Sequence, residues 1–269
     1  MGKTIVCWSP VHGQGATTSN TVALASVLAL DQPYRTLLTH TQLSYSTMEG
    51  MFSKGKKQVF DDGGMVALER LVKSKLLKPD DVPAYTETIY KSRLDFLPGG
   101  NVSVETKDIE QVLFTILRAA QQQYDLIWID AHSGTANKST STLLKQADLV
   151  IVNLPQNKFI IEQFYNPETF PEELKDKPYI VVISQYDNKA SYSLRNLKRQ
   201  LKVKMPLYEV LYDTGFRDAV NQDAVMEFFY RATKTQKGDA LYPFVNSLRE
   251  INDAVLKKLD FTRAEDEWA

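Results

Sequence analysis

The stretch WSPVHGQGATTSN, residues 8–20, carries residue types that can hold a phosphate group. Gly13 and Gly15 lack a side chain, so main-chain N–H groups can approach a ligand closely there. The apolar run that follows predicts a helix, whose positive end attracts anions. Thr17 and Thr18 stand at its first turn, where the Thr17 hydroxyl can bind Mg²⁺ and the Thr18 hydroxyl can reach an inner phosphate. These features together indicate a phosphate-binding loop.

The cation that usually accompanies such a loop is missing. Against the pattern G-x-x-x-x-G-K-S/T, Ala16 stands at the lysine and Pro10 at the first glycine. Two interpretations are therefore open on this stretch alone. One is a nucleotide site that has lost its charge, and the other is a structural glycine turn without a ligand.

The three histidines, His12, His40 and His132, each follow a predicted strand. Because the carboxyl ends of parallel strands meet at one edge of a sheet, we expect all three to face one crevice. They can form a transition-metal site, assist phosphate binding in place of the lysine, or lie there by coincidence. Asn153 and Gln185 also end predicted strands, where each can meet a nucleotide base or serve only in a turn.

Short apolar runs alternate with helix-length segments along the whole chain. Such near-continuous runs are typical of parallel strands that helices cover on both faces. The alternation predicts an α/β fold, doubly wound, with a mostly parallel sheet and helices on both faces. We expect strands at residues 3–9, 34–40, 94–100, 124–130, 147–155, 177–184 and 206–213, and helices at 17–30, 109–123 and 242–259.

We expect residues 1–269 to form a single domain, because no repeat and no Pro-, Gly- or Ser-rich linker interrupts the pattern. Residues 45–91 are less regular and rich in lysine, which predicts an insertion of mixed helix and loop at the edge of the sheet. Residues 242–269 combine a helix with an acidic tail. The apolar spacing of that helix predicts core packing, since a membrane-surface helix usually has a basic polar face.

The composition disfavours several classes of function. A formal net charge of -1 provides no general attraction for nucleic acid or anionic lipid. The single cysteine, Cys7, excludes an intramolecular disulfide and argues against an iron–sulfur cluster. With no signal peptide and no apolar run of membrane-spanning length, we expect a cytoplasmic protein without a transmembrane segment. Basic runs at 54–57, 73–78 and 195–204 keep DNA binding as a disfavoured alternative.

The order of these segments resembles the ParA/MinD family of P-loop ATPases, whose loop reads K-G-G-x-G-K-T-T. In that alignment Val11 stands for the signature lysine, His12 for the first glycine and Ala16 for the second lysine. YDLIWIDAHSG, residues 124–134, is similar to the Walker B strand and switch II turn of the family. The resemblance implies a nucleotide site at His12, Gly13, Gln14, Gly15, Ala16, Thr17, Thr18 and Gln185, Mg²⁺ ligands at Thr17 and Asp130, and a switch II turn that includes His132 and Gly134.

After its second strand the family carries D-x-D, whose second aspartate positions the attacking water. Here His40 and Gln42 occupy these two switch I positions. Gln42 can hold a water molecule but cannot take its proton. Two lysines and one carboxylate are thus missing together, and the sequence identifies no catalytic residue with which an efficient ATPase could work.

The resemblance implies ATP or ADP with Mg²⁺ as the ligand, a homodimer, and a protein partner in a larger assembly. The pattern GQGATT is similar to the TadZ/CpaE-like branch, which localises pilus-assembly and secretion machinery and also tends to lose the lysine. We therefore expect a weakly hydrolysing or non-hydrolysing positioning or regulatory factor, recruited to the inner membrane face or pole through partners. A slow ATPase that takes its cation from elsewhere, such as Lys138, and a nucleotide-free scaffold are the alternatives.

Overall fold

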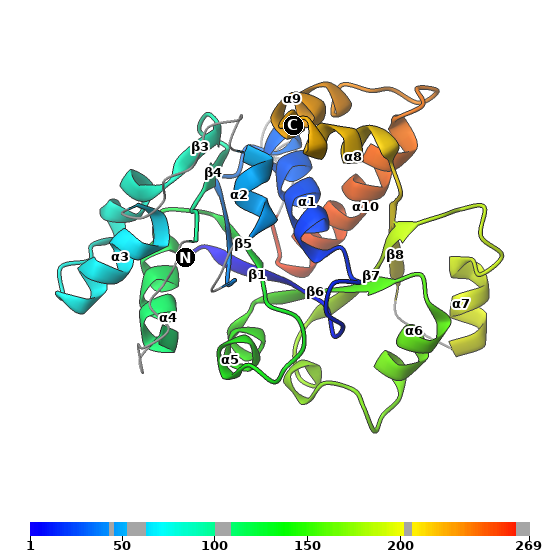
Figure 1. Cartoon of the computed structure of the whole chain (residues 1–269), viewed down its shortest axis with the longest axis horizontal. Helices are drawn as coiled ribbons and strands as arrows, with labels where there is room; N and C mark the ends of the chain where they lie inside the picture. Colours follow the sequence, from blue (N-terminus) through cyan, green and yellow to red (C-terminus); the bar gives the residue numbers. More distant parts are fainter. Residues whose placement is uncertain (43–45, 53–62, 100–108, 202–205, 262–269) are drawn as a thin grey trace.

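The computed structural model describes residues 1–42, 46–52, 63–99, 109–201 and 206–261 (Figure 1). The basic run at 54–57 and the acidic tail from residue 262 therefore lie outside the described residues, as does part of the predicted 45–91 insertion. The strands are β1 (Lys3–Trp8), β2 (Thr36–His40), β3 (Glu87–Tyr90), β4 (Leu94–Phe96), β5 (Leu126–Asp130), β6 (Leu149–Pro155), β7 (Tyr179–Tyr186) and β8 (Leu207–Leu211).

These strands form one eight-stranded sheet in the order β3-β4-β2-β5-β1-β6-β7-β8. Every neighbouring pair is parallel except β3 and β4, so the predicted mostly parallel sheet is confirmed. The antiparallel strand β3 lies within the segment expected to hold only helix and loop. It is four residues long and pairs on one side only, which explains its weak sequence signal.

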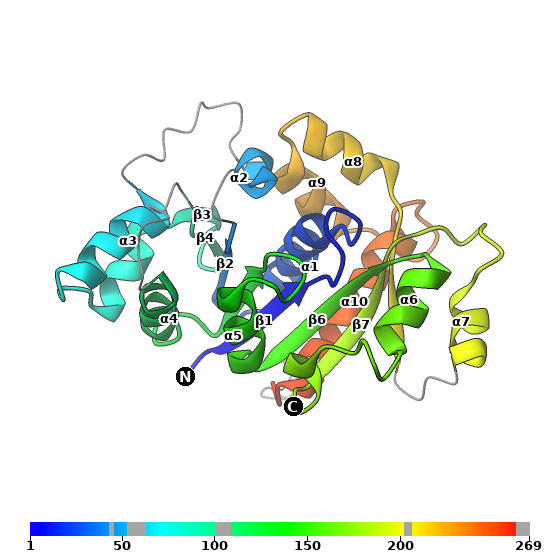
Figure 2. The same cartoon turned by 60° about the horizontal axis from the view of Figure 1, so that its bottom comes forward.

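Helices cover both faces of the sheet (Figures 1 and 2). The helices of the first face are α1 (Thr17–Asp31), α2 (Thr47–Phe52), α8 (Thr214–Asn221), α9 (Val225–Ala232) and α10 (Tyr242–Lys258). The second face is covered by α3 (Gly64–Lys73), α4 (Ile109–Ala120), α5 (Lys138–Gln146), α6 (Lys158–Tyr165) and α7 (Leu194–Leu201). Two 3-10 helices, Pro79–Tyr85 and Glu172–Leu174, complete the described elements.

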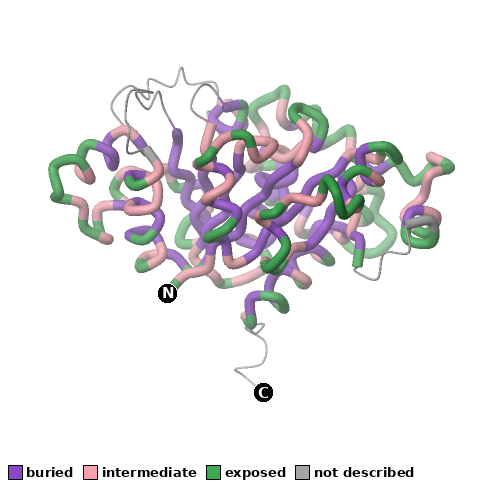
Figure 3. The backbone as a smooth tube through the Cα atoms, turned by 90° about the horizontal axis from the view of Figure 1, so that it is seen from below, coloured by how far each residue is buried: buried purple, intermediate pink, exposed green. Residues whose placement is uncertain are grey.

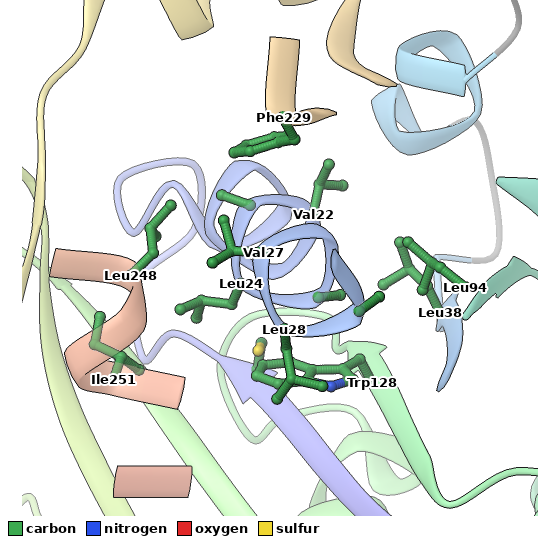
Figure 4. Packing of buried hydrophobic residues seen from close by; sticks show 14 of the residues in the cluster. Val22, Leu24, Val27, Leu28, Leu38, Leu94, Trp128, Phe229, Leu248 and Ile251 are labelled. Atoms are coloured by element: carbon green, nitrogen blue, oxygen red, sulfur yellow. The ribbon is translucent and has the colours of Figure 1, made fainter. Parts of the chain in front are cut away.

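Helix α1 lies at the centre of the first apolar layer. Its residues 20–29 are all buried, as Figure 3 shows for the middle of the molecule, because neighbouring elements surround it. In Figure 4, Val22 and Leu24 of α1 pack among Trp128 of β5, Phe229 of α9 and Leu248 of α10. The prediction that the last helix packs in the core is confirmed. Helix α1 is likewise surrounded, and its residues 22–29 are apolar except for Ser26.

Strand direction places several connections at one edge of the sheet. The carboxyl ends of β1, β5 and β6 are adjacent, because β1 pairs with both of the other two strands. From β1 the chain crosses to β2 on one side, whereas β6, β7 and β8 follow on the other side. Ligands of doubly wound sheets bind at such a reversal. Among the described residues, no helix is long and apolar enough to cross a membrane.

Candidate functional site

The β1–α1 loop, residues 9–16, joins the end of β1 to the start of α1. Two of its residues have left-handed backbone conformations, Gly13 with φ of 70° and Ala16 with φ of 46°. Ala16 is the N-cap of α1 and caps it with no side-chain hydrogen bond. The first N–H groups of α1 are therefore not occupied by a capping side chain. Such a helix start is suited to an anion, and residues 9–16 contain no lysine or arginine.

A network of buried polar side chains, Asn20, Asn153 and Ser184, lies next to this loop. A Cβ atom added to Gly15 would lie 2.4 Å from Ser9 Oγ and 2.9 Å from the Asn153 carbonyl oxygen, so only glycine fits there. Asn20 donates to Asn153 Oδ1 at 2.7 Å and to Ser184 Oγ at 2.8 Å. Asn153 is fully buried. The interpretation of Asn153 as a base-contacting residue gains no support, because its buried side chain is hydrogen-bonded to Asn20 and to the carbonyls of Trp8 and Ile151.

Asp130 ends β5 beside the loop, in register with Cys7 of β1. The hydroxyl of Thr18 donates to Asp130 Oδ2 over 2.6 Å, so the start of α1 is tied to this carboxylate. Thr17, the predicted partner of Asp130 in metal binding, is the preceding residue and only partly buried. Hydroxyl and carboxylate oxygens are ligands that Mg²⁺ accepts. The residues present here are chemically suited to that ion.

Burial controls the ionisation of Asp130, whose exposed fraction is 1%. Desolvation raises the pKa of this carboxyl from 3.8 to about 6, although the Thr18 hydroxyl and His40 oppose the shift. Glu49 adds to the increase through like-charge repulsion. In the ligand-free protein, this carboxylate is thus ionised at a free-energy cost that a nearby cation would reduce.

The turn after β5, residues 131–134, is fastened to the β1–α1 loop. The N–H of Gly134 donates to the Ser9 carbonyl at 2.9 Å. The indole N–H of Trp8 donates to the Gly134 carbonyl at 2.9 Å. The two predicted sites, the phosphate loop and the switch II turn, are therefore adjacent and mechanically connected.

His12 and His132 lie next to each other, whereas His40 makes a separate contact. The rings of His12 and His132 stack with centroids 6.0 Å apart, and His12 Nδ1 lies 2.9 Å from the hydroxyl oxygen of Ser133. His40 is buried and contacts Glu49 instead. Within the part of the chain that the structure describes, no group of three or more His, Cys, Asp or Glu residues is arranged to hold a metal ion. The metal-site interpretation thus gains no support.

His40 is locked in position at the end of β2. The N–H of Gln42 donates to His40 Nδ1 at 3.2 Å, so the ring proton lies on Nε2, which donates to Glu49 Oε1 at 2.5 Å. Burial opposes ionisation of Glu49, but the hydrogen bonds from His40 and from the N–H of Gly99 hold the pKa of this carboxyl below its usual value. His40 therefore orients the backbone of Gln42, and its two ring nitrogens are both engaged.

A pocket of about 120 Å³ opens on the other side of the loop. Ala16 and Gln185 both line it, which places the predicted base-contacting residue next to the phosphate loop. Gln185 has φ of 49°, at an irregularity in the pairing of β7 with β8. The Arg217 guanidinium lies over the Tyr212 ring at 4.7 Å, and both residues line the pocket with Phe216.

The pocket walls from β8 and α8 were only broadly indicated by the sequence. The sequence predicted a strand at 206–213, but none of the pocket-lining residues of this region was singled out. Phe216 and Arg217 lie in the first turn of α8, and their spacing in the sequence does not mark them as pocket residues. Their role as pocket walls depends on α8 folding back beside α1.

Comparisons with known proteins support the fold. No family model and no curated protein matches the sequence. Among solved structures, a ParA family ATPase from Chlorobium tepidum has a TM-score of 0.72 at 11% identity, with 94% of this chain and 99% of that chain covered. MinD from Pyrococcus horikoshii, complexed with Mg-ADP, has a TM-score of 0.67 at 12% identity, with coverages of 96% and 99%.

A third structure, the McdA–ATP complex from Cyanothece, has a TM-score of 0.64 at 12% identity, with coverages of 97% and 98%. These likenesses span nearly the whole of each chain. The protein therefore has the fold of ParA/MinD-type P-loop ATPases, as the order of its segments predicted.

Proposed function

We propose that this protein binds ATP or ADP with Mg²⁺ at the β1–α1 loop, hydrolyses it slowly or not at all, and acts as a dimeric positioning or regulatory factor in a larger cytoplasmic assembly. Pilus-assembly or secretion machinery is the assembly that the similarity to the TadZ/CpaE-like loop favours. The proposal also treats residues 1–269 as one domain. Two of the similar structures contain Mg-ADP or ATP, which supports a nucleotide as the ligand.

One observation carries the binding proposal. The loop keeps its anion-binding backbone, with left-handed Gly13 and Ala16 and an uncapped α1, although the lysine is absent. The Thr18 hydroxyl and the Asp130 carboxylate remain in contact beside it. Main-chain N–H groups and a helix start are sufficient to bind a phosphate. The pocket beside Ala16 provides space for part of a base.

Slow hydrolysis follows from the charges that are missing. Phosphoryl transfer depends on neutralising charge that develops on the transferred group, so loss of cations affects the transition state most. No lysine or arginine occurs in residues 8–18. Gln42 offers no base for the attacking water, and both ring nitrogens of His40 are engaged.

An apolar surface beside the loop supports a role in association. Val11, which stands at the family's signature lysine, lines a groove of about 210 Å³ whose other lining residues are mostly apolar: Trp8, Pro10, Ile160, Phe164 and Pro171, with the polar residues Thr135, Gln163 and Thr169. Phe159, at the start of α6, is 73% exposed. Because Val11 cannot reach a partner's phosphate as a lysine does, we expect dimerisation to depend little on nucleotide. Sedimentation velocity with and without ATP tests this, and a monomer under both conditions contradicts it.

Titration of the purified protein with labelled ATP and ADP, with and without Mg²⁺, tests the nucleotide proposal. We expect saturable binding that Mg²⁺ strengthens, and phosphate release near the background rate. Absence of binding in all four titrations would favour the nucleotide-free scaffold. Rapid phosphate release that Thr17→Ala abolishes would favour a genuine ATPase.

The structure weakens one version of the ATPase alternative. Lys138, the candidate replacement cation, is 86% exposed on its side chain and lies 3.6 Å from Glu110 Oε2. This ion pair directs Lys138 toward α4, and no hydrogen bond or ion pair connects it to a described residue of the loop. A cation for catalysis would therefore have to come from elsewhere, such as a partner protein.

A further inference from the structure

An exposed cluster of His12, Ser133 and His132 connects the β1–α1 loop to the turn after β5. His12 lies near the middle of the loop and is exposed, whereas His132 and Ser133 are half-buried and follow Asp130 by two and three residues. The cluster joins segments that are 121 residues apart through the His12–Ser133 contact of 2.9 Å. His12 belongs to the predicted nucleotide site, but no particular phosphate has been assigned to its side chain above.

One of the two possible donor–acceptor arrangements of the cluster leaves a ring nitrogen of His12 as a free donor. His132 Nδ1 lies 2.9 Å from the Ser133 carbonyl, an acceptor, so this nitrogen must carry the proton and donate. The Ser133 hydroxyl can donate to His12 Nδ1. His12 then carries its own proton on Nε2, and no described residue pairs with that nitrogen. The result is a free N–H donor on an exposed ring, held by Ser133 and stacked against His132.

The position of the cluster indicates which part of a ligand it would meet. The start of α1, with Thr17 and Thr18, follows the end of the loop, whereas His12 lies near the middle of the loop, against the turn that follows Asp130. In P-loop proteins the terminal phosphate lies at the metal and at the switch turns, and those turns respond to its presence. A donor at this corner is suited to the outermost phosphate rather than to the inner ones.

We infer that His12 recognises the terminal phosphate of a bound nucleoside triphosphate, with Ser133 and His132 as positioning residues that hold its ring. This inference rests on the proposed nucleotide binding. It adds a reason why the protein would bind a nucleoside triphosphate more tightly than a diphosphate. The free Nε2–H replaces part of what the missing lysine would supply, as a hydrogen-bond donor. A phosphate would also select the arrangement in which Ser133 donates to His12, because the opposite arrangement presents a lone pair to the anion.

The test is the ratio of affinities for Mg-AMP-PNP and Mg-ADP, measured by calorimetry on the full chain. For His12→Ala we expect the Kd of AMP-PNP to rise roughly ten- to a hundredfold, because a hydrogen bond to a charged group is lost, while the Kd of ADP stays within about twofold. His12→Lys should restore or exceed the original preference, which a merely structural histidine would not allow. Ser133→Ala should reduce the preference by a smaller factor, since the ring loses its support.

Thr135→Ala is the matched control, because it removes a hydroxyl just beyond that turn, two residues after Ser133, and leaves the three cluster residues unchanged. We expect it to change neither affinity. An unchanged preference in His12→Ala, or an equal loss for both nucleotides, overturns the inference while leaving nucleotide binding in place. Failure of the unaltered protein to bind either nucleotide overturns the proposed function itself. Thermal unfolding of each variant confirms that the fold is kept.

Discussion

Replacing Asp130 with asparagine tests whether the protein keeps a carboxylate that its own fold disfavours. Burial raises the pKa of this carboxyl to about 6 from an ordinary value of 3.8. Since one pKa unit corresponds to 1.36 kcal/mol, ionisation is about 3 kcal/mol less favourable in the folded than in the unfolded protein. Asn keeps the size of the side chain and can still accept a hydrogen bond from Thr18.

The effect on stability depends on pH in a definite direction. Below about pH 3.8 the carboxyl is protonated in both states, so it contributes no penalty. Between about pH 3.8 and 6 the unfolded chain releases its proton while the folded protein retains it, so stability falls as the pH rises. Above about pH 6 the full penalty of about 3 kcal/mol is present. About 2 kcal/mol of it develops between pH 4.5 and 7.5.

Urea unfolding of the unaltered protein and of Asp130→Asn at pH 4.5 and 7.5 measures this effect. We expect the stability of the variant relative to the unaltered protein to increase by about 2 kcal/mol from the lower to the higher pH. Comparing differences removes the contributions of all other carboxyls and any constant effect of the new amide. Mg²⁺-dependent nucleotide binding should be lost in the same variant.

Thr18→Val is a companion variant for which the expected change in stability at neutral pH has the opposite sign. It keeps the shape of the side chain but removes the hydroxyl that donates to Asp130 Oδ2. We expect a loss of about 1.5–3 kcal/mol at pH 7.5 and a smaller loss at pH 4.5, where the carboxyl is more often protonated. A stability difference between Asp130→Asn and the unaltered protein that is the same at both pH values would refute the reasoning.

Four further substitutions probe the loop and the buried network beside it. Gly15→Ala should abolish nucleotide binding and lower the free energy of unfolding by about 1–3 kcal/mol, since its Cβ would meet Ser9 and Asn153. Gly13→Ala has open space around its Cβ and should lower the free energy of unfolding by only about 1–2 kcal/mol, the cost of a left-handed backbone at alanine. Similar nucleotide binding by both variants in a fluorescent-nucleotide assay would contradict this. Asn153→Ala should lower the free energy of unfolding by about 1–3 kcal/mol in urea, because Asn20 loses a buried acceptor; an unchanged midpoint would be incompatible with the network. Ala16→Lys should raise the affinity for ATP roughly ten- to a hundredfold in the same titrations. It adds no backbone strain, because Ala16 already has φ of 46°. An unchanged affinity would show that the loop does not present this residue to phosphate.

The central part of the fold could be predicted from the sequence because burial on both sides leaves a simple signature. Strands β1, β5, β6 and β7 are near-continuous apolar runs, and helix α4 shows helical spacing. The missing lysine at Ala16 and the polar residues at the strand ends are also properties of the chain alone. These features follow from local composition, so no distances were needed to detect them.

The partners of the site residues were decided only by tertiary structure. The sequence assigned Thr17 and Asp130 to a metal, which stays a prediction, whereas the hydrogen bond from the Thr18 hydroxyl to Asp130 became visible only in the tertiary structure. His40 was grouped with the other histidines, but Glu49 and Gly99 enclose it. Which side chains meet depends on strand register and on where each helix begins, and a difference of one residue turns a side chain to another face. Local sequence patterns carry the type of each element but not that alignment, which long-range packing sets.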